Sequence, residues 1–127
     1  MKKAILTSQA PKPIGPYNQA IQYDNILFVS GQIPLDPATG ELIKTGVREE
    51  TIQVMNNLKA ILSKAGMDFN DIVKTTIFLK NMDDFSIVNT EYGNFFRNSS
   101  PPARETVEVS KLPLNVNVEI SCIAFKK

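Results

Sequence analysis

Near the C-terminus, two segments typical of β-strands carry charged and hydroxyl side chains at alternating positions. The first segment includes Arg104 and Thr106, and the second includes Glu119 and Ser121. Side chains alternate between the two faces of a strand, so residues two positions apart share a face. The sequence therefore predicts one strand that presents a cation with a hydroxyl, and another that presents a carboxylate with a hydroxyl.

A hairpin would bring these two polar faces together. The predicted strands, 104–109 and 116–125, are joined by a connection rich in turn-forming residues. If Val109 pairs with Val116, the residues opposite each other are Arg104 with Ser121 and Thr106 with Glu119. In this register the guanidinium and the carboxylate lie about one diagonal step apart on one polar face.

A guanidinium and a carboxylate at this spacing suggest chemistry on a small carboxylic acid. The fixed fork of N–H donors on Arg104 matches the two oxygens of a planar carboxylate. Glu119 could then orient or deprotonate a water that adds to an electrophilic carbon beside the bound carboxylate. The alternative is an Arg–Glu pair that neutralises itself on the sheet surface, where exposed pairs contribute little stability.

The composition narrows the chemistry that any site in this chain can use. The sequence contains no histidine and one cysteine. These counts exclude Ser-His-Asp and Cys-His nucleophile systems, HExxH zinc sites and Cys/His zinc clusters. Acid–base chemistry is left to carboxylates, lysine, tyrosine, the thiol, backbone groups or water.

Size and patterning predict one soluble domain over residues 1–127. The 127 residues fit one core, and 43% hydrophobic with 21% charged residues is typical of a globular protein. A formal charge of +1 gives no overall basic field for a phosphate backbone, so a nucleic-acid partner is not expected. Apolar runs are far shorter than the ~20 residues of a membrane helix, and the N-terminal apolar stretch is too short for a secretory signal. We therefore expect a cytoplasmic protein without a membrane partner.

The predicted elements are six strands and two helices. Apolar residues at helical spacing indicate a helix over 47–65, which packs one face on a sheet and stops at Gly66. A second helix is capped by Asp83 or Asp84 and carries an apolar stripe that begins at Phe85. Besides the two C-terminal strands, extended segments are predicted at 3–7, 20–23, 26–30 and 72–79, with residues 24–25 as the turn of a hairpin.

Several other side chains have both a functional and a structural interpretation. Tyr17 lies in a turn fixed by glycine and proline, so its hydroxyl either points into a pocket or packs over a loop. Asn89 flanks the apolar stripe of the second helix, either as a ligand contact or as a surface amide. Cys122 shares an apolar strand face and is expected in the core, because no cation lies near to lower its pKa. Gly31 and Gly40 are expected in turns.

Short segments spread over nearly the whole chain carry a family pattern. They are 14–17 (IGPY), 30–34 (SGQIP), 37–41 (PATGE), 57–62 (NLKAIL), 88–89 (VN), 102–109 (PARETVEV) and 118–120 (VEI). In this order they resemble the RidA/YjgF family. The resemblance implies an α+β fold like that of the bacterial-type chorismate mutase, with a mixed sheet and two helices packed on one face. It also implies a homotrimer with active sites in the clefts between subunits.

The same resemblance implies an activity and a set of site residues. The activity is hydrolysis of reactive 2-imino acids, chiefly 2-iminobutanoate and 2-iminopropanoate, to 2-oxo acids and ammonia, which protects pyridoxal-phosphate enzymes. No cofactor and no metal is implied. The implied catalytic residues are Arg104, which binds the substrate carboxylate, and Glu119, which orients water. The implied pocket residues are Tyr17, Ser30, Gly31, Asn89 and Thr106.

Thr106 departs from the family pattern, because many relatives have cysteine at this position. A thiol that did chemistry would make this departure damaging. We expect it to be tolerated, because imine hydrolysis needs no covalent nucleophile.

Two other functions remain open for a chain of this family. One is a non-catalytic trimer that senses a metabolite or regulates a partner. The other is an RNA-directed endoribonuclease or translation inhibitor, against which the balanced charge argues.

Overall fold

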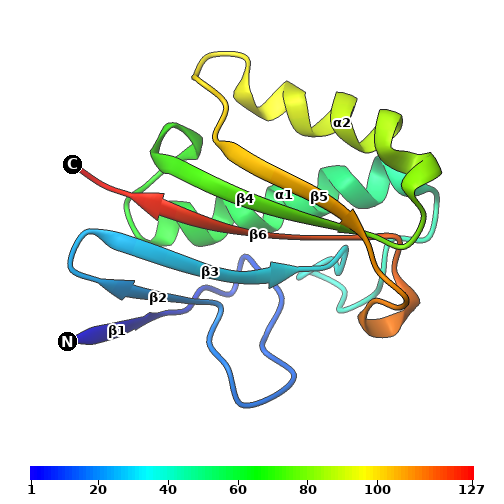
Figure 1. The fold of residues 1–127 in the computed structure, drawn as a ribbon. Coiled ribbons are helices and arrows are strands. Elements are labelled where there is room, and N and C mark those ends of the chain that lie inside the picture. Colours follow the sequence, from blue (N-terminus) through cyan, green and yellow to red (C-terminus); the bar gives the residue numbers. More distant parts are fainter.

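The computed structural model describes residues 1–127, which form a six-stranded sheet covered on one face by two helices (Figure 1). The strands are β1 Lys2–Ile5, β2 Ala20–Tyr23, β3 Ile26–Gln32, β4 Ile72–Leu79, β5 Ala103–Glu108 and β6 Val118–Phe125. The helices are α1 Val47–Lys64 and α2 Phe85–Gly93, with short 3-10 turns at Phe69–Asp71, Met82–Asp84, Asn94–Phe96 and Pro113–Asn115. The expected α+β class, with a mixed sheet and both helices on one side, is confirmed. Neither helix has the length and apolarity that crossing a membrane requires.

The sheet has the strand order β1-β2-β3-β6-β4-β5, and only β4 and β5 are parallel neighbours. The predicted hairpin of β2 and β3 is confirmed, and Asp24 in its turn has a φ of 52°. Asp tolerates this left-handed conformation better than most residues. The parallel pair is possible because α2 forms the crossover that returns the chain to the same end of the sheet.

The predicted hairpin between the two C-terminal strands is wrong. β4 lies between them, antiparallel to β6 and parallel to β5. The segment of β5 is rich in charge and suits the edge of a sheet, whereas β6 is apolar enough for a position with a neighbour on each side. The register that placed Thr106 opposite Glu119 and Arg104 opposite Ser121 therefore does not occur.

Helix α1 supplies the centre of the core. Its stripe of Val54, Leu58 and Ile61 is fully buried, each with 0% exposure. The helix ends where the sequence predicts, because Gly66 follows it with a φ of 72°. A left-handed glycine at this point lets the chain turn out of the helix without a Cβ clash.

Alternation along the strands separates a face covered by the helices from an open face. The buried positions of β4 and β6 on the covered face include Thr75, Ile77, Ile120 and Cys122. On the open face, Phe28 and Phe125 are each 47% exposed. The predicted core position of Cys122 is confirmed, and burial raises the pKa of its thiol to about 12. The two faces have different chemistry, and each carries part of the candidate site.

Candidate functional site

Arg104 and Glu119 point to opposite faces of the sheet. In the register of the strands, Arg104 lies beside Thr75, which in turn lies beside Cys122, so all three share the covered face. Glu119 is three residues before Cys122 on β6 and therefore points to the open face. With β4 between them, the two strands are about 10 Å apart. Within one chain, the guanidinium and the carboxylate cannot bind the same small molecule.

The site residues therefore form two groups. We call Tyr17, Ser30, Gly31 and Glu119 the carboxylate half-site; they line one open cavity of about 390 Å³. The remaining lining residues, which the sequence did not single out, are Ile14, Ile33 and Pro113. We call Asn89, Arg104 and Thr106 the guanidinium half-site; these residues lie on α2 and β5.

A β-bulge shapes the carboxylate half-site. The pairing of β3 with β6 shifts between Val29 and Gln32, which leaves Ser30 and Gly31 in an irregular stretch of the strand. Gly31 is therefore part of β3. The prediction that it lies in a turn is wrong. A Cβ at this position would lie 2.3 Å from Oε2 of Glu119, closer than any two such atoms approach. The carboxylate of Glu119 lies against the backbone of Gly31, so any side chain at this position would displace it.

The electrostatics of Glu119 suit a group that accepts a proton. Partial burial raises the pKa of its carboxyl above the ordinary value of 4.5. Neither of the two ion pairs of the chain involves Glu119 or Arg104. A carboxylate with a raised pKa and no cationic partner can take a proton from water near neutral pH.

Hydrogen bonds to a buried amide hold the loop that carries Tyr17. The side chain of Gln19 is 1% exposed; its Oε1 accepts from the backbone N–H of Thr7, and its Nε2 donates to the carbonyl oxygens of Thr7, Ala10 and Pro11. Ser30 joins the same loop to β3, because its hydroxyl donates to the carbonyl oxygen of Asn18 at 2.6 Å. Tyr17 itself is 47% exposed at the cavity. Its ring is thus positioned by the loop backbone.

A second buried amide holds the segment that follows β3. Nδ2 of Asn57, on α1, donates to the carbonyl oxygens of Ile33 and Leu35 at 3.1 and 3.0 Å. Asn57 is 1% exposed and lies in the predicted helix 47–65, within the segment 57–62 that carries part of the family resemblance. Both amides are positioning residues that sequence patterns did not reveal. For Asn57, a polar residue on the apolar side of the predicted helix was the available signal.

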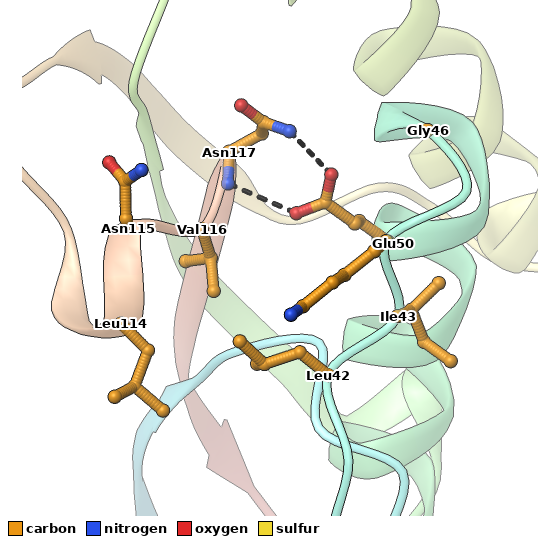
Figure 2. Close-up of a pocket in the computed structure, with 9 residues that line it drawn as sticks. Leu42, Ile43, Gly46, Glu50, Leu114, Asn115, Val116 and Asn117 are labelled. Atoms are coloured by element: carbon orange, nitrogen blue, oxygen red, sulfur yellow. Dashed lines mark hydrogen bonds between the residues drawn. The ribbon is translucent and has the colours of Figure 1, made fainter.

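The start of β6 is anchored by Glu50 of α1 (Figure 2). Its carboxylate accepts from the backbone N–H of Asn117 at 3.0 Å and from its Nδ2 at 2.5 Å. Glu50 is only 4% exposed, and Asn117 precedes Glu119 by two residues. The pair therefore fixes the strand on which the catalytic carboxylate is predicted.

The guanidinium half-site lies between the edge strand β5 and helix α2. The guanidinium carbon of Arg104 lies 5.1 Å from the ring centroid of Tyr92 and 5.7 Å from that of Phe85. Two residues along the same strand face, Oγ1 of Thr106 is buried and has no hydrogen-bond partner. Asn89 is exposed on α2, within one turn of both rings. The half-site thus offers a cation and an unused hydroxyl, which suits an anionic guest with a further polar group.

No three Asp, Glu or Cys side chains come together in the way that metal ligands do. The chemistry available to the two half-sites is that of Arg104, Glu119, hydroxyl groups and water. Each half-site contains one of the two predicted catalytic groups.

Comparisons with known proteins agree with this architecture. The family model described as Endoribonuclease L-PSP matches residues 7–126. A RutC family protein of Pyrococcus horikoshii is 52% identical over 127 residues, which is 100% of each chain. The crystal structure of the E. coli YjgF gene product matches with a TM-score of 0.95 at 45% identity, covering 98% of this chain and 99% of that one. This chain belongs to the RidA/YjgF family.

Two further members of the RidA/YjgF family have informative names. A mouse protein named 2-iminobutanoate/2-iminopropanoate deaminase is 48% identical over 126 residues, which is 99% of this chain and 93% of the relative. The structure of E. coli TdcF with bound serine matches with a TM-score of 0.95 at 38% identity, covering 98% of this chain and 99% of that one. The RidA/YjgF family thus includes an imine deaminase and a protein that binds a small amino acid.

Proposed function

We propose that this protein hydrolyses small 2-imino acids, such as 2-iminobutanoate and 2-iminopropanoate, to 2-oxo acids and ammonia. The observation that carries the proposal is a pair of unpartnered, complementary groups, the guanidinium of Arg104 and the carboxylate of Glu119. The name of the mouse relative supports this reaction, and the serine bound to TdcF supports a pocket for a small carboxylic acid.

The placement of the two half-sites supports a site shared between copies. Because Arg104 and Glu119 face opposite sides of the sheet, a complete site needs the guanidinium half-site of one copy and the carboxylate half-site of another. A head-to-tail contact of this kind forms a closed ring when repeating the rotation between neighbouring copies returns to the first copy. We propose a homotrimer with three such sites, in which exposed apolar residues of the open face, Phe28 and Phe125 among them, are covered.

In this site the imine would be hydrolysed without a covalent intermediate on the protein. Arg104 binds the carboxylate of the substrate through two parallel hydrogen bonds and so places C2 against the carboxylate half-site. Water adds to C2 of the protonated imine, Glu119 takes the proton of the water, and the C=N electrons move to nitrogen. The resulting carbinolamine receives that proton on nitrogen, the C–N bond breaks, and ammonia leaves as the hydroxyl becomes the carbonyl of the 2-oxo acid. The proton of that hydroxyl passes to Glu119 and from there to the departing ammonia, which leaves as ammonium, so the carboxylate is regenerated.

The test is a coupled assay in which a pyridoxal-phosphate threonine dehydratase produces 2-iminobutanoate. With the dehydratase in excess, we expect added protein to accelerate the appearance of 2-oxobutanoate over uncatalysed hydrolysis of the imine. Arg104→Ala is expected to remove the acceleration, because the carboxylate loses its bidentate partner. Arg97→Ala is the matched control, since Arg97 is exposed and donates only to Asn94 within its own turn. Equal acceleration by Arg104→Ala and the native protein would contradict the proposal.

The pH profile tests the part assigned to Glu119. A base is active when deprotonated, so the rate is expected to fall as the pH decreases through its pKa. Because burial raises the pKa of Glu119, the acid limb of kcat/KM should lie above the ordinary value of 4.5. A rate that stays constant down to pH 4.5 would exclude Glu119 as the base.

The same protein can separate catalysis from sensing. A metabolite-sensing trimer would bind 2-oxobutanoate in calorimetry yet leave the imine reaction at its uncatalysed rate. That result would replace the deaminase proposal with a binding function at the same half-sites.

A further inference from the structure

Arg104 is held in place by aromatic rings and by no ion pair. The ring centroids of Tyr92 and Phe85 lie 5.1 and 5.7 Å from its guanidinium carbon, both within the range of cation–π attraction. The two ion pairs of the chain, Arg48 with Glu91 and Lys74 with Glu105, do not involve it. The strand that carries Arg104 lies at the edge of the sheet and has a neighbour on one side only. We call Phe85 and Tyr92 the aromatic seat.

The seat is itself fixed by the sheet. The hydroxyl of Tyr92 is hydrogen-bonded to Oγ1 of Thr75 at 2.7 Å, and Thr75 is 0% exposed. Thr75 lies beside Arg104 in the register of β4 and β5. A continuous series of contacts therefore runs from the backbone of an inner strand through Tyr92 to the guanidinium. Burial also raises the pKa of Tyr92, so its ring remains the neutral phenol over the pH range of an assay.

Unlike Tyr92, Phe85 makes no contact that holds the fold together. It is 37% exposed at the start of α2 and is not a member of the buried core. An exposed phenylalanine gains little from its position, but here its ring lies close to a cation. Because aromatic rings and no carboxylate lie beside the guanidinium, its N–H donors are left for the carboxylate of a substrate. The side chain also loses less rotamer freedom on binding, because the seat has already restricted it.

We infer that Phe85 and Tyr92 are positioning residues that hold the Arg104 guanidinium in the orientation that binds the substrate carboxylate, with Thr75 fixing Tyr92. The inference rests on the proposed function and adds to it the residues that set affinity for the carboxylate. Removing a ring is expected to weaken carboxylate binding in ground state and transition state alike. KM should therefore rise while kcat changes little.

The experiment compares Phe85→Leu and Tyr92→Leu in the coupled assay. We expect KM to rise about three- to fivefold for Phe85→Leu and about tenfold for Tyr92→Leu, with kcat within about twofold. Tyr92→Phe keeps the ring and loses the bond to Thr75, so a smaller rise is expected. Phe85→Tyr keeps an aromatic ring at this position, so its KM should equal that of the native protein. Phe95→Leu is the matched control, because Phe95 packs on Phe69 and does not contact Arg104.

A binding measurement without turnover separates this inference from the proposed function. Calorimetry with 2-oxobutanoate should show the same fold-change in Kd as the assay shows in KM. If Arg104→Ala leaves Kd and rate unchanged, the proposed function itself fails. If Arg104→Ala weakens binding but Phe85→Leu leaves Kd unchanged, only the aromatic seat is disproved. Phe85 is partly exposed, so this variant remains informative even if Tyr92→Leu does not fold.

A series of ligands distinguishes a seat from a direct contact. A ring that acts through Arg104 affects every 2-oxo acid equally, because all of them share the carboxylate. Pyruvate, 2-oxobutanoate and 2-oxohexanoate should therefore lose affinity by the same factor in Phe85→Leu. A loss that grows with the length of the alkyl chain would show that Phe85 contacts the substrate and would overturn the inference.

Discussion

The two half-sites are built by different means. Arg104 in the guanidinium half-site is positioned by packing, on aromatic rings that belong to the helix layer. Glu119 in the carboxylate half-site is positioned by hydrogen-bonded loops and by a bulge in β3. A packed cation tolerates small changes in its surroundings because dispersion and cation–π attraction fall off gradually. A carboxylate that must direct one water depends on a few exact contacts, so the same perturbation costs more there.

Both half-sites are open toward solvent. The carboxylate half-site is a hollow of about 390 Å³ on the open face, and the guanidinium half-site lies at the edge strand next to α2. An enzyme that completed its site within one chain would need both groups on one face. Here Arg104 and Glu119 lie on opposite faces, which agrees with the proposed site between two copies of the chain.

The largest expected effect comes from dividing the two halves between chains. Arg104→Ala and Glu119→Ala should each abolish imine hydrolysis when assayed alone. In hetero-oligomers made by co-expression of the two variants, a site formed by one intact half from each chain should be active, giving about a quarter of native activity for random assembly. The measurement is the specific activity of the co-purified mixture, with separately purified variants as the control. Two variants that remain inactive together would contradict a site shared between copies.

Gly31→Ala tests how tightly the carboxylate half-site is fitted. The new methyl group would overlap Oε2 of Glu119, 2.3 Å away, and displace the base. We expect kcat to fall about a hundredfold, the lower range of a general base's contribution, with little change in the melting temperature. Gly93→Ala is the control, because no atom lies within 4 Å of its added Cβ; it should keep full activity. Equal activity of the two variants would contradict the close contact between Gly31 and the carboxylate of Glu119.

The elements could be predicted from the sequence to within a few residues, because each has a local pattern. The helical spacing of Val54, Leu58 and Ile61 marks α1, and Gly66 marks its end. The turn at Asp24 marks the hairpin of β2 and β3. The pairing of β5 was mispredicted because neighbours in sequence were taken as neighbours in the sheet. The overlooked signal was the order of the predicted elements over 72–109. A strand followed by a helix and another strand favours a parallel pair joined by a crossover.

The site was predictable as a set of residues but not as an arrangement. Arg104 and Glu119 were identified by type, and the structure shows that alternation places them on opposite faces. Phe85 was recognised only as the start of an apolar stripe, since spacing does not reveal that a cation lies beside its ring and that of Tyr92. Long-range contacts of this kind depend on strand order, which local patterns do not specify.

Glu50→Ala tests the anchor of the carboxylate half-site at a distance from the chemistry. Loss of the carboxylate leaves the N–H and Nδ2 of Asn117 without their partner, so we expect a loss of about 2–3 kcal/mol of unfolding free energy. Glu49→Ala removes an exposed acid from the same helical turn and should cost within about 0.5 kcal/mol. Urea denaturation of both variants measures the difference. Equal stabilities would show that water replaces the carboxylate at no cost.

The smallest expected effect concerns the one thiol of the chain. Cys122 is 3% exposed beneath the helices, and burial raises the pKa of its thiol to about 12, so almost no thiolate exists at pH 8. We expect iodoacetamide to leave the native protein unlabelled and its activity unchanged, while urea-unfolded protein takes up a label by mass spectrometry. Thr106, which lies in the guanidinium half-site, carries a hydroxyl and no thiol, so iodoacetamide does not alkylate it. Inactivation of the folded protein by iodoacetamide would contradict both the burial of the thiol and a mechanism without a nucleophile.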